Sequence, residues 1–349
     1  MEGEMKNFMM VCISVLASLS YSYIIGRSIP KGSFRLLFLL PVLSIFLLLP
    51  LSLSSIHLIG ITAFSISWLA IFKLLLFAFG QGPLSLTTST MSLLRFISLS
   101  SLPIKIKHNP TNKSKPKSKS PLNYAIQIAL LVLTIHAYNY KHYYIFIHLK
   151  FVYILFCLHI YLSLELILAM LASLAKALLG HELESQFNEL YLSTSLIDYW
   201  GRRWNTTVTF ILRPIVYEPT QQVAMGTMLG RRWPVLASLM AVMATFLVSG
   251  LMHELIFYYL GRTRPTWENT WYHLLHGFCL ACEIAVKKAL AGRWKLHRVV
   301  SITLTIGFVM VTAYWLFFPP LLRCDALART LDDYSALIGF VKQVLSFKS

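Results

Sequence analysis

The sequence predicts an all-helical protein that crosses a membrane with eight or nine helices. Of its 349 residues, 56% are hydrophobic and only 13% are charged, whereas soluble domains have about 25% charged residues. The hydrophobic residues gather in runs of about 20, the length with which an α-helix crosses the hydrocarbon core of a bilayer. Lys and Arg lie mostly in the polar segments between these runs, as in the loops of membrane proteins.

Eight runs are long and apolar enough to be interpreted as membrane spans. In chain order they cover residues 8–25, 36–53, 58–79, 122–139, 143–163, 235–260, 271–290 and 299–318. Residues 164–179 form either a ninth span or a continuation of the fifth run, bent at Glu165. Residues 335–347 are amphipathic, so we expect them to lie flat on the membrane surface. No soluble domain is evident, and we expect residues 1–349 to form a single membrane domain.

The basic residues of the loops indicate how the spans are oriented. The first loop is basic between residues 27 and 35, and the segment 101–121 reads as a mobile, lysine-rich cytosolic loop. Five spans then place the segment 180–234 in the cytosol or at its membrane interface. Arg262 and Arg264 fall on the far side and are exceptions to this scheme. A ninth span would invert everything that follows it.

The net charge of +17 and the five cysteines argue against two other classes of protein. The positive charges lie in loops between apolar runs, so they indicate orientation in a membrane rather than binding to nucleic acid. The cysteines are odd in number and mostly lie within apolar runs, so we expect no disulfide framework. We interpret Cys279 and Cys282 as packing residues of a membrane helix.

The run 235–260 contains two ionisable residues, His253 and Glu254. An ionisable residue inside a span costs a few kcal/mol and is a candidate functional residue by default. Ser249 and Gly250 precede His253 by four and three residues, so on a helix they share its face and leave room for a substrate chain. The alternative is structural: the histidine is hydrogen-bonded between packed helices, and the two small residues mark a helix crossing.

The histidines form a weak pattern for a metal site. The sequence HELIF, which begins at His253, resembles the zinc-protease motif but has Phe257 in place of the second histidine. His273 and His276 could join His253 and Glu283 around an ion, but metal oxygenases of membranes use denser histidine clusters. We therefore expect no metal.

A second group of candidates lies in the stretch DYWGRRWNTTVTFILRP. Arg202 and Arg203, placed between Trp200 and Trp204, are suited to the phosphates of lipid headgroups or of a phosphorylated co-substrate. An amphipathic helix anchored on anionic lipid would explain the same mixture. Anchoring on lipid explains Asn205 less well, because Asn205 begins an apolar run in which its amide group must find hydrogen-bond partners. A neutral donor in such a place can orient a carbonyl or stabilise an oxyanion.

Three stretches carry a resemblance to a known family: YLSTSLIDYWGRRWNTTVTFILRP, FLVSGLMHELIFYYL and RPTWENTWYHLLHG. The chain resembles, over nearly its whole length, the plant wax ester synthases of the membrane-bound O-acyltransferase superfamily. It has LIDYWG where that family more usually has LQDFWG. The resemblance implies an enzyme of the endoplasmic reticulum that joins a fatty acyl group from acyl-CoA to a long-chain alcohol. It places the family's histidine at His253 and the partner asparagine at Asn205.

The resemblance implies a direct transfer without a cofactor, with acyl-CoA as co-substrate. His253 would take the proton of the alcohol as general base, and Asn205 would orient the thioester carbonyl or stabilise the oxyanion. The expected substrate-binding residues are Trp200, Arg202, Arg203, Trp204, Ser249 and Gly250.

Two alternatives stay open at this point. Acyl transfer to a sterol is equally compatible with the motifs, because nothing in them separates a flat acceptor from a flexible one. A transporter is less consistent with the sequence, since two matching halves are absent.

The position of His253 along its helix predicts a deep substrate channel. His253 lies about 28 Å along a straight helix from Pro234, so we also expect residues 204–212 to lie partly inside the membrane.

Overall fold

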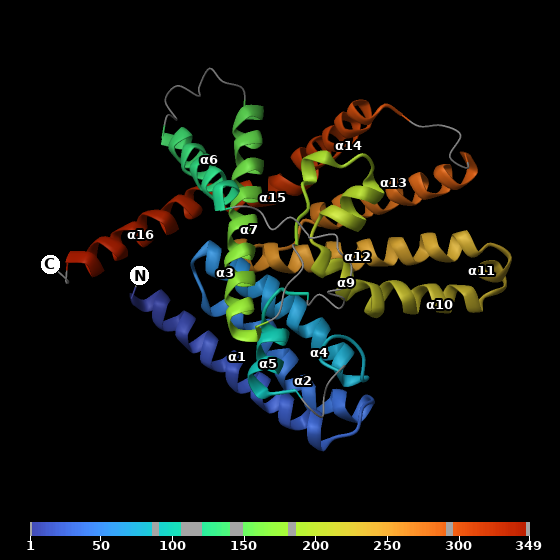
Figure 1. Cartoon of the computed structure of the whole chain (residues 1–349), viewed down its shortest axis with the longest axis horizontal. Coiled ribbons are helices and arrows are strands. Elements are labelled where there is room, and N and C mark those ends of the chain that lie inside the picture. The colour runs from blue at the N-terminus through green and yellow to red at the C-terminus, as the bar shows by residue number, and fades with distance from the viewer. Residues whose placement is uncertain are drawn as a thin grey trace.

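The structure, a computed structural model, describes residues 2–85, 91–105, 121–139, 149–180, 186–290 and 296–346. Every regular element within these ranges is a helix, which confirms the predicted all-helical class (Figure 1). Most of the lysine-rich loop expected at 101–121 lies outside the described residues.

The N-terminal third folds into a compact group of helices at the bottom of Figure 1. It consists of α1 (Glu2–Ser28), α2 (Ser33–Leu48), the 3-10 helix η1 (Leu49–Ser52), α3 (Ile56–Thr62), the π-helix η2 (Ala63–Ala70), α4 (Ile71–Ala78) and α5 (Leu93–Ser101). The helices α3, η2 and α4 follow one another without a break and form the predicted span at 58–79. The short helix α5 is not in the prediction, since it is too short to cross a bilayer.

The next two helices are α6 (Pro121–Asn139) and α7 (Leu149–Leu179), which lie side by side. Because α7 is continuous over 31 residues, the second of the two alternatives for residues 164–179 holds: they continue the fifth span and do not form a ninth. Glu165 is buried and accepts a hydrogen bond of 3.0 Å from Nε2 of Gln127 on α6. This contact allows an acidic residue within the helix without a bend that would end it.

The segment predicted at 180–234 is a series of short helices rather than a loop. They are η4 (Leu190–Leu192), α8 (Leu196–Asp198), η5 (Tyr199–Arg203), α9 (Thr206–Leu212), η6 (Arg213–Tyr217), α10 (Glu218–Gly226) and α11 (Met228–Arg232). From α9 to α10 the chain runs as a nearly continuous helix, and the short α11 lies at the turn between α10 and α12, which lie side by side at the right of Figure 1. Nε2 of Gln221 donates to Oγ of Ser238 at 2.9 Å, which joins α10 to the start of α12.

The C-terminal third is built around a pair of long helices. These are α12 (Pro234–Gly261) and α13 (Glu268–Leu290), which run antiparallel and lie side by side. The chain continues through α14 (Arg298–Thr312), η7 (Ala313–Phe317), α15 (Phe318–Arg323) and α16 (Ala326–Ser346).

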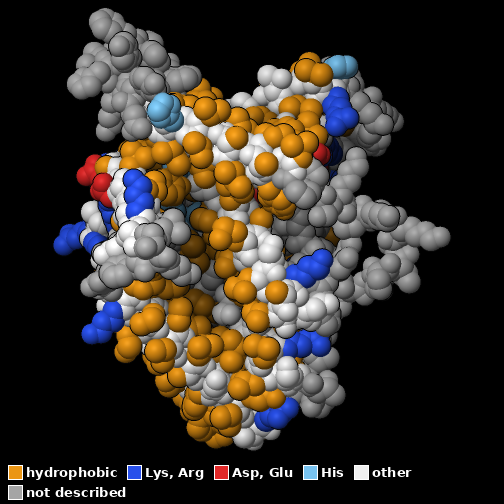
Figure 2. Space-filling view, turned by 60° about the vertical axis from the view of Figure 1, so that its left-hand side comes forward, with side chains coloured by type: hydrophobic (Ala, Val, Ile, Leu, Met, Phe, Trp, Pro, Cys, Tyr) orange, Lys and Arg blue, Asp and Glu red, His pale blue; other side chains and the backbone are white. Residues whose placement is uncertain are grey.

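Six helical stretches among the described residues are long and apolar enough to cross a membrane. They are Gly3–Ser28, Ser33–Ser52, Ile56–Ala78, Tyr153–Leu179, Pro234–Gly261 and Arg298–Arg323. Large hydrophobic side chains on them face outward, for example Phe34, Met170 and Val299 at 60%, 72% and 63% exposure. Hydrophobic side chains also spread over the face seen in Figure 2. A surface of this kind is suited to lipid rather than to water.

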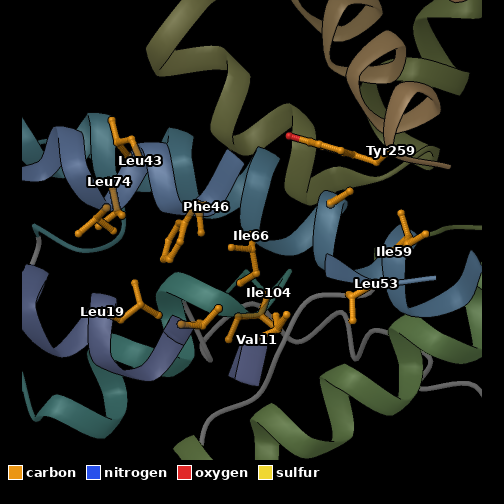
Figure 3. Close-up of a cluster of buried hydrophobic side chains, with 14 of the residues drawn as sticks. Val11, Leu19, Leu43, Phe46, Leu53, Ile59, Ile66, Leu74, Ile104 and Tyr259 are labelled. Atoms are coloured by element: carbon orange, nitrogen blue, oxygen red, sulfur yellow. The ribbon is translucent and has the colours of Figure 1, made fainter. Parts of the chain in front are cut away.

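One hydrophobic core joins the N-terminal helices to α12. Val11 and Leu19 of α1 lie close to Phe46 of α2 and Ile66 of η2 (Figure 3). From the other side Tyr259 of α12 enters the cluster, and its hydroxyl donates to the carbonyl of Leu47 at 2.7 Å. The core therefore fixes α12 against the first half of the chain.

Arg262 explains one exception to the predicted orientation. Its Nη2 donates to the carbonyls of Pro50 and Leu53 at 3.0 and 3.2 Å. The guanidinium thus donates to carbonyl groups at the end of η1, of which that of Pro50 also accepts the backbone N–H of Leu53. The charge of Arg262 serves packing between α12 and η1, so it is a poor indicator of membrane orientation.

Both ends of the chain are attached to the loop before α3. Oε1 of Glu4 on α1 accepts from the backbone N–H groups of Ser54 and Ser55 at 2.8 Å. Oδ2 of Asp333 on α16 accepts from Oγ of Ser55 and contacts Nδ1 of His57, both at 2.8 Å. The first turn of α1 and the middle of α16 therefore meet at the same place.

Candidate functional site

The imidazole of His253 lies among aromatic rings contributed by distant parts of the chain. Ring centroids lie 5.1 Å away at Trp68 of η2, 4.3 Å at His273 of α13 and 6.0 Å at Phe317 of η7. Four elements thus meet around the residue that the sequence singled out. The rings around His253 make its surroundings mostly apolar.

Hydrogen bonding determines which nitrogen of His253 carries the proton. Nδ1 lies 2.7 Å from the carbonyl oxygen of Ser249. A carbonyl oxygen can only accept, so Nδ1 is the donor and Nε2 keeps the lone pair. Nε2 has no hydrogen-bond partner among the described residues. In its neutral form His253 therefore keeps the lone pair of Nε2 free.

His273 repeats this arrangement on the facing helix. Its Nδ1 lies 2.7 Å from the carbonyl of Asn269, so it too donates from Nδ1 and presents Nε2. The two rings are inclined by 33° to each other. Two neutral imidazoles therefore lie together at the crossing of α12 and α13.

His276 differs because both of its ring nitrogens have partners. Nδ1 accepts a hydrogen bond of 3.1 Å from Nε1 of Trp200, and Nε2 donates to Oγ1 of Thr312 at 2.8 Å. Glu283 is also engaged, since its Oε2 accepts from the backbone N–H of Leu196 at 2.9 Å. The grouping of these residues with His253 around a metal is therefore not supported, and the described residues contain no set of three suitable ligands.

Gly250 sets the distance between the two helices. A Cβ added there would lie 2.9 Å from Cα of Thr270 and 3.3 Å from Cβ of His273. The structural interpretation of the small residues as a helix crossing therefore holds for Gly250. The close approach also brings the ring of His273 to that of His253, so the helix crossing positions both histidines of the site.

Glu254 has a structural partner on the same pair of helices. Its Oε1 accepts a hydrogen bond of 3.1 Å from the backbone N–H of Thr270, in the first turn of α13. A carboxylate at a helix N-terminus is stabilised by unpaired N–H groups and by the helix dipole. Glu254 therefore makes a structural hydrogen bond, which fixes where α13 begins beside α12.

The stretch from Trp200 to Asn205 reaches the site through Trp200. Besides its hydrogen bond to His276, the Trp200 ring lies 6.1 Å from the ring of His273 and 5.4 Å from that of Phe246 on α12. Trp204 stacks on Tyr199 at 5.7 Å. These contacts hold η5 against α12 and α13.

The two adjacent arginines have different environments. Arg203 forms an ion pair of 2.8 Å with Asp198, and its Nη1 donates to the carbonyls of Asn188 and Glu189 at 3.1 Å. Its donors therefore hold the local fold together. Arg202 is exposed, so of the two it is the one placed to meet a phosphate group.

Asn205 caps the start of α9. It adopts a left-handed backbone with φ of 34°, which asparagine tolerates better than most residues, and its Oδ1 accepts from the N–H of Val208 at 3.2 Å. The residue is buried, and Nδ2 keeps its protons for donation. Among the described residues no hydrogen bond joins Asn205 to His253; the bond that Asn205 makes is the cap of α9.

Three further residues at the crossing escaped the sequence analysis as functional candidates. Trp68 comes from a span of the other half of the chain, and no sequence signal pairs it with His253. Asn269 is 0% exposed, and neither Oδ1 nor Nδ2 has a hydrogen-bond partner among the described residues. Oγ1 of the neighbouring Thr270 is likewise buried without a partner there.

A profile described as the membrane-bound O-acyl transferase family matches residues 183–280, which contain both His253 and Asn205. The chain is 46% identical over 341 residues to acyl-CoA–sterol O-acyltransferase 1 of Arabidopsis thaliana, covering 97% of each chain. It is 44% identical over 349 residues to the long-chain-alcohol O-fatty-acyltransferase of Simmondsia chinensis, covering 99% of this chain and 97% of the relative. A probable long-chain-alcohol O-fatty-acyltransferase 3 of Arabidopsis thaliana is 44% identical over 344 residues, with 98% and 97% covered.

The helical bundle, the histidine within an apolar helix and the matched profile define a multi-pass membrane acyltransferase. With relatives that match along almost its entire length, the chain belongs to the plant long-chain-alcohol O-fatty-acyltransferase family of the membrane-bound O-acyltransferases.

Proposed function

We propose that this acyltransferase moves a fatty acyl group from acyl-CoA to a long-chain alcohol, forms a wax ester, and does so in the endoplasmic reticulum membrane. The observation that carries the proposal is the free Nε2 of His253 at the crossing of α12 and α13. The names of several relatives support the alcohol as acceptor.

The proposed reaction is a direct transfer. The oxygen of the alcohol attacks the thioester carbonyl carbon while its proton moves to Nε2 of His253. The C–S bond then breaks, and the leaving thiolate of CoA takes the proton from the imidazolium. The hydrogen bond from Nδ1 to Ser249 keeps the ring in the tautomer that this step needs.

Asn205 and Arg202 are proposed to hold the acyl-CoA. Since Oδ1 of Asn205 is used in capping α9, the amide is fixed with Nδ2 as its available donor, which suits a thioester oxygen or oxyanion. Trp200 and Trp204 would form the wall along which the thioester passes. Arg202 is exposed at this end and would meet the phosphates of CoA.

We further propose that α6 and α13 cross the membrane in addition to the six stretches given above, which makes eight spans. The start of α12 pairs with the polar helix α10 through Gln221 and Ser238, so its first turns would lie outside the hydrocarbon core. Measured from Ser238, His253 lies about 22 Å along α12. The site would then be deep, but closer to the cytosolic face than the full length of α12 suggests.

A second candidate function is acyl transfer to a sterol, because a relative with 46% identity is an acyl-CoA–sterol O-acyltransferase. The test is to express the full chain in a host that lacks neutral-lipid acyltransferases and to supply labelled acyl-CoA with a fatty alcohol, a sterol or diacylglycerol in turn. We expect wax ester as the main product and none from His253→Ala. Steryl ester as the main product would show that the acceptor is a sterol and not a long-chain alcohol. Full activity of His253→Ala would refute the mechanism.

A further inference from the structure

The carboxamide of Asn269 is a polar group that the mechanism above leaves unused. It is completely buried, and both of its polar atoms lack partners among the described residues. An unpaired buried amide is unfavourable, and most buried polar groups in proteins are paired. A bound substrate that supplies the missing hydrogen bond would account for this residue.

Asn269 lies on the same helix as His273, whose Nε2 has no hydrogen-bond partner among the described residues. It precedes His273 by one helical turn, and its own carbonyl accepts the proton of Nδ1 of that residue. The ring of His273 in turn lies 4.3 Å from the ring of His253. Beside Asn269, the hydroxyl of Thr270 is also buried without a partner there. Unsatisfied polar atoms thus gather where a proton is to be transferred.

His276 and Asn269 mark opposite ends of the site along α13. Trp200, which belongs to the stretch that ends in Asn205, is bonded to His276 at one end of the series. Asn269 stands at the other end, with His273 between them. If the thioester arrives along Trp200, the group that meets Asn269 comes from the opposite side, as the attacking alcohol must.

We propose that Asn269 binds the hydroxyl group of the acceptor, and this assignment rests on the proposed acyl transfer. Nδ2 donates a hydrogen bond to a lone pair of the hydroxyl oxygen, which leaves the hydroxyl proton directed at Nε2 of His253. Hydrocarbon chains and sterol rings offer nothing to an amide, so the hydroxyl is the part of the acceptor that this residue recognises. Asn269 is thereby a specificity-determining residue for the acceptor.

The test compares Asn269→Leu and Asn269→Ala with the wild-type full chain, using labelled acyl-CoA and a titrated long-chain primary alcohol. We expect KM for the alcohol to rise about tenfold or more, the equivalent of about 1.4 kcal/mol, with KM for acyl-CoA unchanged. Since no internal hydrogen bond is lost, the melting temperature should stay the same or rise. The alanine variant keeps the test valid if leucine does not fit.

Ser67→Ala is the matched control. Ser67 is buried and its hydroxyl donates to the carbonyl of Phe46 at 2.6 Å, so this variant should melt at a lower temperature with unchanged KM values. A lower melting temperature with unchanged KM in the Asn269 variants would show a structural role and overturn the assignment, as would a lower kcat with unchanged KM for the alcohol. Failure of the wild type to form any ester would instead overturn the proposed function itself.

Discussion

Gly250 determines how closely α13 approaches α12, and Gly250→Ala tests whether the reaction depends on that approach. The added Cβ would lie 2.9 Å from Cα of Thr270. Carbon atoms prefer separations of about 3.5 to 4.0 Å, so the helices must move apart by roughly 0.5 to 1 Å. Overpacking of this kind costs about 1 to 3 kcal/mol. Because a misplacement of about 1 Å can lower a rate about 100-fold, the rate of ester formation should fall together with the stability.

We therefore expect Gly250→Ala to form ester roughly 10 to 100 times more slowly and to melt at a lower temperature. The assay is the initial rate of ester formation in the detergent-solubilised full chain, with thermal unfolding followed in the same preparation. Gly307→Ala is the matched control, because Gly307 is also helical and an added Cβ there has nothing within 4 Å. It should keep its rate and gain up to about 1 kcal/mol of stability. Equal rates in the two variants would refute the reasoning.

Two further predictions concern the supports of the site and of the bundle. Trp200→Phe keeps an aromatic ring but removes the donor to Nδ1 of His276, so we expect a loss of about 1 to 3 kcal/mol in the free energy of unfolding; an unchanged thermal unfolding curve would contradict it. For Asp333, burial raises the pKa of the carboxyl, but hydrogen bonds from His57 and Ser55 outweigh that effect and hold the pKa below its usual value. A lowered carboxyl pKa contributes stability above the usual value of about 3.9, and this is lost as the pH falls through the lowered pKa. Asp333→Asn should therefore melt at a lower temperature at neutral pH and like the wild type in strong acid; a constant difference across this range would argue against stabilisation of the carboxylate by these hydrogen bonds.

The long helices were predictable because length and hydropathy determine them. The run at 235–260 became α12, and the run at 299–318 became α14 to α15 with small changes at the ends. The short helix α5 was not predictable in the same way. Nζ of Lys73 on α4 donates to the carbonyls of Leu99 and Leu102 at 2.7 Å and so closes the end of α5. That support comes from a residue about 26 positions away and leaves no local pattern.

The residues of the site likewise differ in whether a local sequence signal predicts them. His253 was found because an ionisable group within an apolar run is a local signal, and its tautomer follows from a carbonyl one turn away. Its neighbours Trp68 and His273 come from other helices, so only packing brings them there. Arg202 and Arg203 are equivalent in the sequence, and only the ion pair with Asp198 distinguishes them.

The shared attachment of both chain ends to the loop before α3 constrains how the polypeptide is threaded through the bilayer. Glu4 and Asp333 bind neighbouring residues of this loop, so the start of the chain and α16 must emerge on one and the same face. A chain that begins and ends on one face has traversed the membrane an even number of times. Eight crossings satisfy that parity, whereas nine would place Asp333 a full bilayer away from Ser55.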